Sequence, residues 1–383
     1  MIPRTVRKIL IVRLSARGDL VFASPLAGAL RRRYPNAHIA WAAEEHTADV
    51  IRHNPHLDEV IVWERAAWRR MLRTGRWGTL ARAVADLLER LRDARFDVAL
   101  DAQGLLRSGV LTFLTGAPVR IGLGSREGSR ALMTRVAPRG GDARRIASEY
   151  VHLAEALGLD TRSFPLEIPR SADEVEGAAR VVEREGLQAG FVAVCPFTTR
   201  FHKHWLEERW SEVIRRLRAD MRVGVAMLGG PSDREAADRI LAGAGVRVAG
   251  VDAPGLDAPG KRAGVADTAA DVPVVDLVGR TTLGEAAALV SRCGVLVGVD
   301  TGLSHMAHAY GRPAVLLFGS NTPYLDPPGP GVRILHSGRD CSPCRGKLTC
   351  DGRVDCMRDI TVDEVVGAVG AVLGLSGPVV KAS

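Results

Sequence analysis

Short apolar runs recur along the first part of the chain, and longer segments with the apolar spacing of helices separate them. The first run, Lys8–Leu14, is rich in β-branched residues, which is typical of a buried parallel strand. A turn that contains glycine and a helical segment as far as Arg33 follow it. Because strands and helices alternate, the pattern predicts a parallel, doubly wound sheet. Further strands are predicted at Ile39–Ala43, Val60–Val62, Val98–Leu100 and Val119–Ile121.

The same pattern starts again after Thr161–Gln188, a polar stretch punctuated by proline that we interpret as containing an interdomain linker. We therefore expect two Rossmann-like α/β domains, at residues 1–170 and 188–360. The strands of the second domain are predicted at Phe191–Phe197, Val223–Leu228, Val246–Ala249, Val295–Val299 and Ala314–Phe318.

Two other segments have recognisable patterns. A C-terminal helix is expected at 361–383, because Thr361 and Glu364 have the spacing of a capping box. The stretch Asp252–Asp271 nearly repeats Asp-Ala-Pro-Gly and has few apolar residues, so we interpret it as a flexible surface insertion.

Composition fits a globular protein of 383 residues, with 46% hydrophobic and 25% charged residues. No secretory signal pattern opens the chain, and the uncharged run Val365–Val380 is interrupted by glycine and proline, so we expect a soluble, cytoplasmic protein. The net charge is +8, and residues 1–150 carry 26 Lys and Arg against 15 Asp and Glu. This asymmetry indicates an anionic partner or membrane surface for the first domain, or merely a genome that favours arginine.

The carboxyl ends of parallel strands are where doubly wound sheets bind ligands, and three loops there are rich in chemistry. The first is Ser15–Asp19, in which Gly18 permits a tight turn and Asp19 supplies a carboxylate. The alternative is that Asp19 only caps a helix. No glycine-rich dinucleotide fingerprint follows this strand, which argues against a nicotinamide cofactor.

The second loop, Thr198–Trp205, combines two hydroxyls with cations at the end of a strand, which suits a pyrophosphate. The third, Asp300–His305, places Gly302 where helix amides can approach phosphate oxygens. A solvated basic loop and an ordinary turn are the respective alternatives.

The segment Trp63–Trp77 contains five arginines and three tryptophans. It suits a phosphorylated lipid head group at a membrane interface. Alternatively it is an amphipathic helix whose Trp68 and Leu72 pack inward.

Six cysteines without a signal peptide argue against a disulfide framework. Cys195 and Cys293 are isolated within apolar surroundings and are predicted to belong to the core. The spacing of the other four favours a tetrathiolate site for structural zinc or iron over a disulfide or free thiols. These four are Cys341, Cys344, Cys350 and Cys356.

The loops together resemble glycosyltransferase family 9, the lipopolysaccharide heptosyltransferases, over nearly the whole chain. The motifs Asp-Ala-Gln-Gly-Leu, Thr-Thr-Arg-x-x-Lys-His-Trp and Asp-Thr-Gly-Leu-Ser-His are more similar to heptosyltransferase I than to II. The cysteine cluster is more similar to heptosyltransferase II or to protein-modifying heptosyltransferases. The matching stretches are Gly18-Asp19, Asp101–Leu105, Arg107-Ser108, Ser125–Glu127, Thr198–Arg200, Lys203–Trp205 and Asp300–His305.

This resemblance implies a GT-B fold, in which two Rossmann-like domains face each other across a cleft, and inversion without a catalytic metal or cofactor. It implies that Asp19 is the general base and that Lys203 assists the departure of ADP. The donor-binding residues it implies are Thr198, Thr199, Lys203, Asp300, Thr301, Gly302 and His305, with Asp233 or Glu235 at the adenosine.

The implied reaction is transfer of heptose from ADP-L-glycero-D-manno-heptose to a Kdo residue on lipid A, at the cytoplasmic face of the inner membrane. The N-terminal domain would bind this acceptor and the C-terminal domain the ADP-sugar. A protein O-heptosyltransferase is the closest alternative. A non-catalytic nucleic-acid-binding protein is disfavoured, because the arginines are dispersed among few aromatic residues. The expected acceptor-binding residues are Gln103, Arg107, Arg126, Arg69, Arg70 and Arg73.

Overall fold

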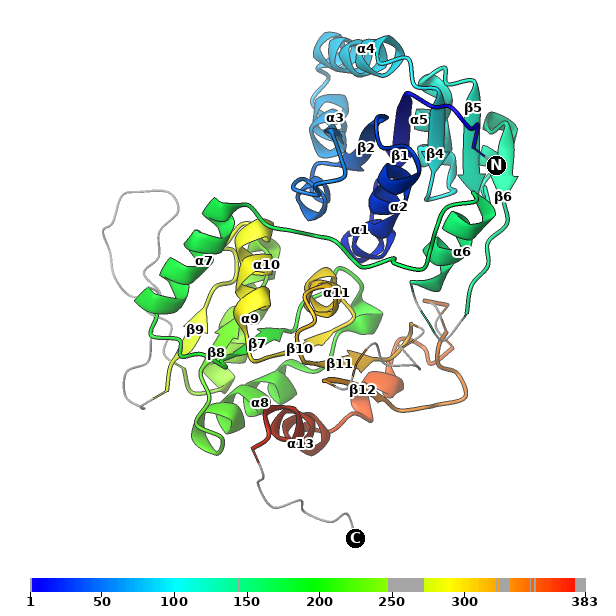
Figure 1. Ribbon diagram of the computed structural model, residues 1–383. Helices are drawn as coiled ribbons and strands as arrows, with labels where there is room; N and C mark the ends of the chain where they lie inside the picture. Colours follow the sequence, from blue (N-terminus) through cyan, green and yellow to red (C-terminus); the bar gives the residue numbers. More distant parts are fainter. Residues whose placement is uncertain are drawn as a thin grey trace. The chain divides into compact units, whose positions relative to one another are not determined.

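The computed structural model divides into two compact units, Met1–Pro169 and Arg170–Ser383, and each contains one six-stranded sheet (Figure 1). Every strand pair in the described part of the chain is parallel. The predicted α/β class with two doubly wound sheets is therefore confirmed. The structure describes residues 2–142, 145, 147–246, 272–321, 323, 329, 331–344, 346–347 and 349–375, so the proposed insertion Asp252–Asp271 lies outside it.

The first sheet has the strand order β3-β2-β1-β4-β5-β6. All five strands predicted for this unit are present, and β6 is an additional, short edge strand. Buried residues such as Ile9 and Ile39 form the centre of this sheet. The strands are β1 Lys8–Val12, β2 His38–Glu44, β3 Glu59–Trp63, β4 Val98–Asp101, β5 Val119–Leu123 and β6 Arg135–Ala137.

The second sheet has the order β12-β11-β10-β7-β8-β9 and so repeats the first arrangement. Of the predicted strand Val246–Ala249 only Val246 is described; the other predicted strands are present, and β9 and β12 are additional edge strands. The strands are β7 Val192–Cys195, β8 Val225–Met227, β9 Val274–Asp276, β10 Val295–Val299, β11 Ala314–Phe318 and β12 Val332–His336.

In each sheet the second and third strands of the unit lie on one side of its first strand, and the fourth strand lies on the other side. The direction in which strands are added therefore reverses between the first and the fourth strand. In the first unit β1 pairs with both β2 and β4, and in the second β7 pairs with both β8 and β10. The loops that leave these central strands diverge at the reversal, which is where open α/β sheets bind ligands. All three chemically rich loops follow one of these strands.

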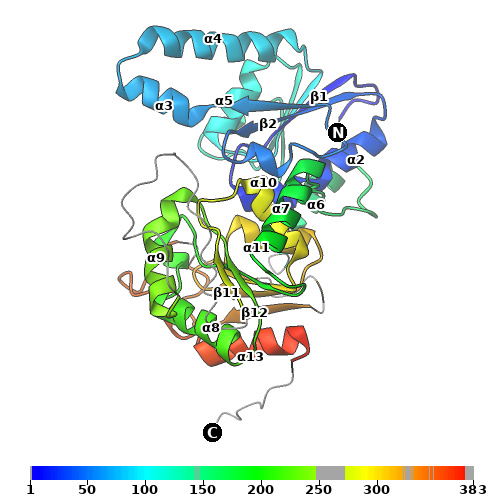
Figure 2. The same ribbon diagram turned by 90° about the vertical axis from the view of Figure 1, so that its left-hand side faces the viewer.

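Helices α4 and α5 cover one face of the first sheet. Leu91 of α4 and Leu111 of α5 join Leu10 and Ala99 of the sheet in one hydrophobic cluster. Helix α3 lies beside α4 and contributes no buried residue (Figure 2). The helices are α1 Arg17–Ala23, α2 Pro25–Arg33, α3 Arg65–Arg73, α4 Trp77–Asp93, α5 Leu106–Leu114 and α6 Ser148–Ala156, with short 3-10 helices η1 Ala48–Val50 and η2 Ser129–Leu132.

In the second unit, helices α8, α9, α12 and α13 pack on one face of the sheet, and Trp210 of α8 and Met357 of α12 belong to that core. Helix α7 packs against α10. The helices are α7 Ala172–Arg184, α8 Glu207–Ala219, α9 Arg234–Gly243, α10 Leu283–Arg292, α11 Gly302–Ala309, α12 Asp355–Arg358 and α13 Val362–Leu373, with 3-10 helices η3 Phe201–Lys203 and η4 Pro231–Asp233.

Capping residues decide where two of these helices begin. Ser171 and Glu174 form a reciprocal capping box at the start of α7, so this part of the stretch interpreted as linker is helical. Thr361 and Glu364 form the predicted capping box of α13. Within the residues that the structure describes, no helix combines the length and the apolar character needed to cross a membrane.

The turn after β4 depends on Gly104. Its φ is +71°, and a Cβ atom there would lie 1.9 Å from the carbonyl oxygen of Leu123. The carboxylate of Asp101 accepts hydrogen bonds from the backbone N–H groups of Gln103 (3.0 Å) and Gly104 (2.9 Å). This turn therefore holds the end of β4 close to the end of β5.

We predict that Gly104→Ala lowers the thermal unfolding midpoint more than Gly116→Ala does. Gly116 has a similar φ of +69°, but a Cβ atom there would have no neighbour within 4 Å, so it controls for the left-handed conformation alone. That conformation disfavours alanine by about 1 kcal/mol, and the backbone clash at Gly104 should add at least about as much again. Equal midpoints for the two variants would contradict this account of the turn.

Candidate active site

Asp19 lies in the first turn of α1, in the loop that follows β1. Its Oδ2 atom accepts a hydrogen bond from the backbone N–H of Ala16 (3.0 Å) and forms an ion pair with Nη2 of Arg13 (2.7 Å). The side chain of Asp19 is nevertheless 47% exposed. Asp19 therefore contacts the start of its helix, as the helix-capping alternative requires, and its carboxylate is also accessible to solvent. The sequence analysis did not identify Arg13, although an arginine at the end of an apolar strand pattern is unusual.

Gln103 and Arg107, which are predicted to bind the acceptor substrate, connect the segment after β4 to the segment after β1. Oε1 of Gln103, which follows β4, accepts from the backbone N–H of Leu14 (3.0 Å). Nη2 of Arg107 donates to Oγ of Ser15 (3.0 Å). Both residues therefore lie beside the loop that carries Asp19. Arg126 is exposed, and its backbone N–H donates to the carbonyl of Gly104 (2.7 Å).

A buried carboxylate organises the cations near Arg107. The Glu44 side chain is only 3% exposed, and it pairs with Arg107 (3.2 Å) and with Arg65 of α3 (3.4 Å). Burial lowers the pKa of Arg107; Glu44 opposes this shift, and the nearby cations Arg65 and Arg69 add to it. The surroundings of Arg107 therefore combine one buried anion with several guanidinium groups.

Helix α3 has a more exposed apolar surface than an inward-packing amphipathic helix would have. Trp68 packs edge-to-face against Trp63, with ring centroids 5.7 Å apart. Leu72 of α3 is 44% exposed, so the alternative in which Leu72 packs inward is wrong, and Trp77 at the start of α4 is 64% exposed. The predicted acceptor residues Arg69, Arg70 and Arg73 are all exposed on this helix.

Asp300, directly after β10, is the centre of the second group of site residues. Its carboxylate is 8% exposed and contacts Nζ of Lys203 (2.8 Å), Nε2 of His305 (3.1 Å) and Nδ2 of Asn321 (2.6 Å). Burial alone would raise the pKa of Asp300, but His305 and Lys203 reverse the shift and hold that pKa well below its usual range. Asn321 follows β11, and the sequence analysis did not identify it.

The loop after β7 brings its polar groups to the same strand ends. Nε2 of His204 lies 2.7 Å from the carbonyl oxygen of Thr198, which closes the loop. Lys203 is anchored by Asp300, while Thr199 is exposed. Trp205 is buried and its Nε1–H donates to the carbonyl of Ile360 (3.1 Å), which fixes the far end of the loop.

The remaining predicted donor residues lie at helix starts. Thr301 is the N-cap of α11 and has an extended backbone, and Gly302 is its first helical residue. Backbone N–H groups at such a start can bind phosphate oxygens. Of the two candidate carboxylates near α9, Asp233 accepts from the backbone N–H of Gly230 (2.8 Å), whereas Glu235 is exposed.

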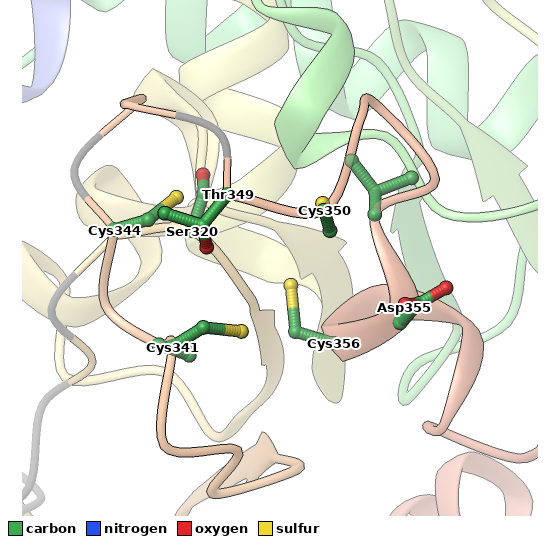
Figure 3. Close-up of a pocket in the computed structure, with 9 residues that line it drawn as sticks. Ser320, Cys341, Cys344, Thr349, Cys350, Asp355 and Cys356 are labelled. Carbon is green, nitrogen blue, oxygen red and sulfur yellow. The ribbon is translucent and has the colours of Figure 1, made fainter.

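The four clustered cysteines line one pocket together with Ser320 and Asp355 (Figure 3). Burial raises the pKa of the Cys356 thiol, and the three other cysteines of the cluster contribute to the same shift. Within the part of the chain that the structure describes, however, no three His, Cys, Asp or Glu side chains are arranged to hold a metal ion. The predicted tetrathiolate site is thus not preformed, although its four residues are neighbours. Cys195 and Cys293 are buried in the core, as predicted.

We predict that Asp300→Asn destabilises the protein at neutral pH by on the order of 3 kcal/mol, because it leaves Lys203 without its anion. An aspartate with a depressed pKa stabilises the fold fully above its unfolded pKa of about 3.9 and loses this contribution as pH falls towards its folded pKa. The difference in unfolding midpoint between wild type and variant should therefore be constant above about pH 5 and shrink below about pH 4.

Asp351→Asn is the control for this pH series, since the Asp351 side chain is 91% exposed and the variant should show little difference at any pH. If the difference in unfolding midpoint between wild type and Asp300→Asn stays the same down to pH 3, the pKa of Asp300 is not depressed.

Known proteins of similar sequence and structure carry related names. Lipopolysaccharide heptosyltransferase 1 of Pseudomonas aeruginosa is 27% identical over 356 residues, which are 90% of this chain and 87% of that protein. A glycosyl transferase of family 9 from Veillonella parvula has a TM-score of 0.77 and 21% identity, covering 97% of this chain and 98% of that chain. An Escherichia coli heptosyltransferase with ADP-2-deoxy-2-fluoro heptose has a TM-score of 0.65 and 22% identity, covering 95% and 99%.

A more distant structure is an iron-containing dodecameric glycosyltransferase from enterotoxigenic Escherichia coli, with a TM-score of 0.51 and 13% identity over 97% of this chain and 77% of that chain. It shares the fold only. The sequence profile of glycosyltransferase family 9 (heptosyltransferase) matches residues 84–251 and 257–354. Because this match spans more than half of the chain, the chain belongs to glycosyltransferase family 9, and it is a transferase with the GT-B fold.

Proposed function

We propose that this enzyme transfers heptose from ADP-L-glycero-D-manno-heptose to a Kdo residue of lipid A, with inversion at the anomeric carbon. The observation that carries the proposal is the ion pair of Lys203 and Asp300, which joins the loop after β7 to the loop after β10. The chain that contains this pair belongs to the heptosyltransferase family. The names of its relatives, which include lipopolysaccharide heptosyltransferase 1, support the substrate class.

In this proposal the second unit binds the donor. Nζ of Lys203 contacts Asp300, and the ammonium has three N–H groups, so we propose that the others bind the phosphates of ADP. Thr198, Thr199 and the start of α11 at Thr301 would supply further hydrogen bonds. His305 and Gly302 complete the set around the pyrophosphate and heptose. We favour Glu235 over Asp233 for the adenosine, because Asp233 already bonds its own turn.

The first unit would bind the acceptor and take its proton. A sugar hydroxyl is a weak nucleophile, and Asp19 would accept its proton while the new glycosidic bond forms and the bond from heptose to ADP breaks. Lys203 and the α11 helix start would stabilise the negative charge that develops on ADP, so the chemistry needs no metal ion. Gln103, Arg107 and Arg126 lie around the same strand ends and are proposed to contact the anionic acceptor.

We propose that the enzyme works at the cytoplasmic face of the inner membrane, where a lipid acceptor is found. The exposed Trp77 and Leu72 beside the arginines of α3 suit an anionic lipid surface. The protein O-heptosyltransferase alternative is not favoured, since the relatives of similar sequence are named lipopolysaccharide heptosyltransferases. Membership of an enzyme family is against the non-catalytic, nucleic-acid-binding alternative.

The first test is mass spectrometry of Kdo-lipid A after incubation with the enzyme and ADP-heptose, with a serine-rich polypeptide as the competing acceptor. We expect one heptose on the lipid and none on the polypeptide, without inhibition by chelators.

Asp19→Ala should reduce turnover by on the order of 10²–10⁴ while donor binding is nearly unchanged.

Asp93→Ala is the matched control, because Asp93 is an exposed aspartate of the same unit at the end of α4. Near-normal turnover of Asp19→Ala would refute the general-base role, and a strict requirement for magnesium would refute the proposed leaving-group chemistry.

A second prediction concerns α3. Changing Arg69, Arg70 and Arg73 together to glutamine should weaken binding to acidic vesicles and to the acceptor several-fold, with ADP affinity unchanged, and high salt should reduce the difference. The same change at three exposed arginines of the second unit, Arg180, Arg184 and Arg215, serves as the charge control. If the α3 variant binds acidic vesicles and the acceptor as tightly as the wild type does, the prediction is contradicted and α3 has only a structural role.

We also propose that the cysteine cluster binds one structural zinc or iron ion. The spacing of Cys341, Cys344, Cys350 and Cys356 and their shared pocket support this, since soft thiolates suit both metals. Binding would require the surrounding loop to adjust so that the thiols come together. A metal held there would stabilise the fold and would take no part in the transfer reaction.

Elemental analysis of purified protein should therefore find up to one metal ion per chain. Stripping the ion should lower the thermal midpoint, while turnover measured below that midpoint keeps its dependence on Asp19. Cys350→Ser should lose the metal, and Cys293→Ala, a buried cysteine outside the cluster, should retain it. Metal-free protein with four reactive cluster thiols would refute the site.

A further inference from the structure

Arg13 is a cation in an unusual position, immediately after the buried strand β1. The residue is only 8% exposed. Burial of a guanidinium is unfavourable unless the charge is paired and its N–H groups are bonded. Its presence at this strand end therefore calls for an explanation beyond the packing of β1, which the buried apolar residues Ile9–Val12 already provide.

The surroundings of Arg13 fix its guanidinium in place. Nη1 donates to the carbonyl oxygen of Ala102 (3.3 Å), at the end of β4. The group also lies over the ring of Tyr150 in α6, 5.9 Å from the centroid, and Tyr150 is 3% exposed. Burial would lower the pKa of Arg13, but Asp19 and Tyr150 outweigh it, so that pKa is raised. Arg13 is thus a fixed and permanently charged donor.

Asp19 is the less constrained member of the pair. Its side chain is 47% exposed, against 10% for Arg13, so the buried partner determines where the exposed one lies. Both contacts of the carboxylate use one atom, because Oδ2 accepts from Arg13 and from the backbone N–H of Ala16. Among the residues that the structure describes, none donates a hydrogen bond to Oδ1. The second oxygen is therefore the one left to meet a ligand.

We infer that Arg13 is a positioning residue, which locks Oδ2 of Asp19 so that Oδ1 receives the proton of the acceptor hydroxyl. The inference rests on the proposed general-base role of Asp19. As the hydroxyl oxygen bonds to the anomeric carbon and ADP departs with the electron pair of the broken bond, the proton moves to Oδ1. Arg13 keeps its own protons throughout and acts only through Asp19.

The test is a double-mutant cycle of Arg13→Met and Asp19→Ala, with steady-state kinetics for both substrates. Arg13→Met removes the charge and keeps most of the volume. We expect it to lower kcat by on the order of 10–10²-fold, with the KM for ADP-heptose unchanged, because a misplaced catalytic group slows the chemical step. In the Asp19→Ala background the same substitution should have almost no further effect on kcat. Arg13→Lys, which retains the charge, should restore part of the loss.

Arg31→Met is the control for loss of a partly buried, paired arginine. Arg31 in α2 bonds the carbonyl of Ala37 (2.6 Å) and pairs with Asp58 (2.6 Å), outside the proposed site. This variant should lower the unfolding midpoint but retain kcat. If Arg13→Met does not fold, the cycle is made with Arg13→Lys, which should still lose part of kcat in the wild-type background alone.

The outcomes separate the two claims. Suppose that Asp19→Ala lowers kcat but the Arg13 variants have a normal kcat, or lower kcat by the same factor with and without Asp19. Either result would overturn the positioning role and leave the general-base proposal intact. A normal turnover of Asp19→Ala would overturn the general-base proposal, and the inference with it.

Discussion

A charge that folding withdraws from water must be paired, and this constraint organises the candidate site in both units. In the first unit the buried cation Arg13 pairs with the more exposed Asp19; in the second the buried anion Asp300 pairs with Lys203. Each buried member directly follows a central strand and holds a less buried partner of opposite sign. The two units thus use the same arrangement with the signs reversed, and the less buried groups are the ones suited to a hydroxyl and to a phosphate.

The position of these pairs follows from strand order, much of which the sequence could predict. Central strands such as β1 and β10 are buried on both faces and read as continuous apolar runs. The strands that were missed, β6, β9 and β12, are all at sheet edges. An edge strand pairs on one side only and tolerates exposed or charged residues, as Arg135 in β6 illustrates, so its apolar signal is weak.

The partners of the site residues were harder to predict than the loops that carry them. Asp300 and Lys203 could be recognised from their motifs, but the contact of Asn321 with Asp300 joins loops after two different strands, β11 and β10. Similarly, Tyr150 in α6 reaches Arg13 after β1 only through the fold. A single sequence contains no periodicity that reports such long-range pairs. What it does contain is the local anomaly of an arginine within an apolar strand pattern, and that signal was available at Arg13.

The segment from Cys356 to Ile360 supports the loops that carry Lys203 and Asn321 through packing. The carbonyl of Ile360 accepts from Trp205, which ends the loop of Lys203. At Gly319, just before Asn321, an added Cβ would lie 2.6 Å from Sδ of Met357 and 2.9 Å from Sγ of Cys356, so only glycine permits this close approach. The segment from Cys356 to Ile360 therefore supports both the loop that carries Lys203 and the turn that carries Asn321. Because Lys203 and Asn321 meet at Asp300, disorder in the cysteine segment would loosen that cluster from two sides.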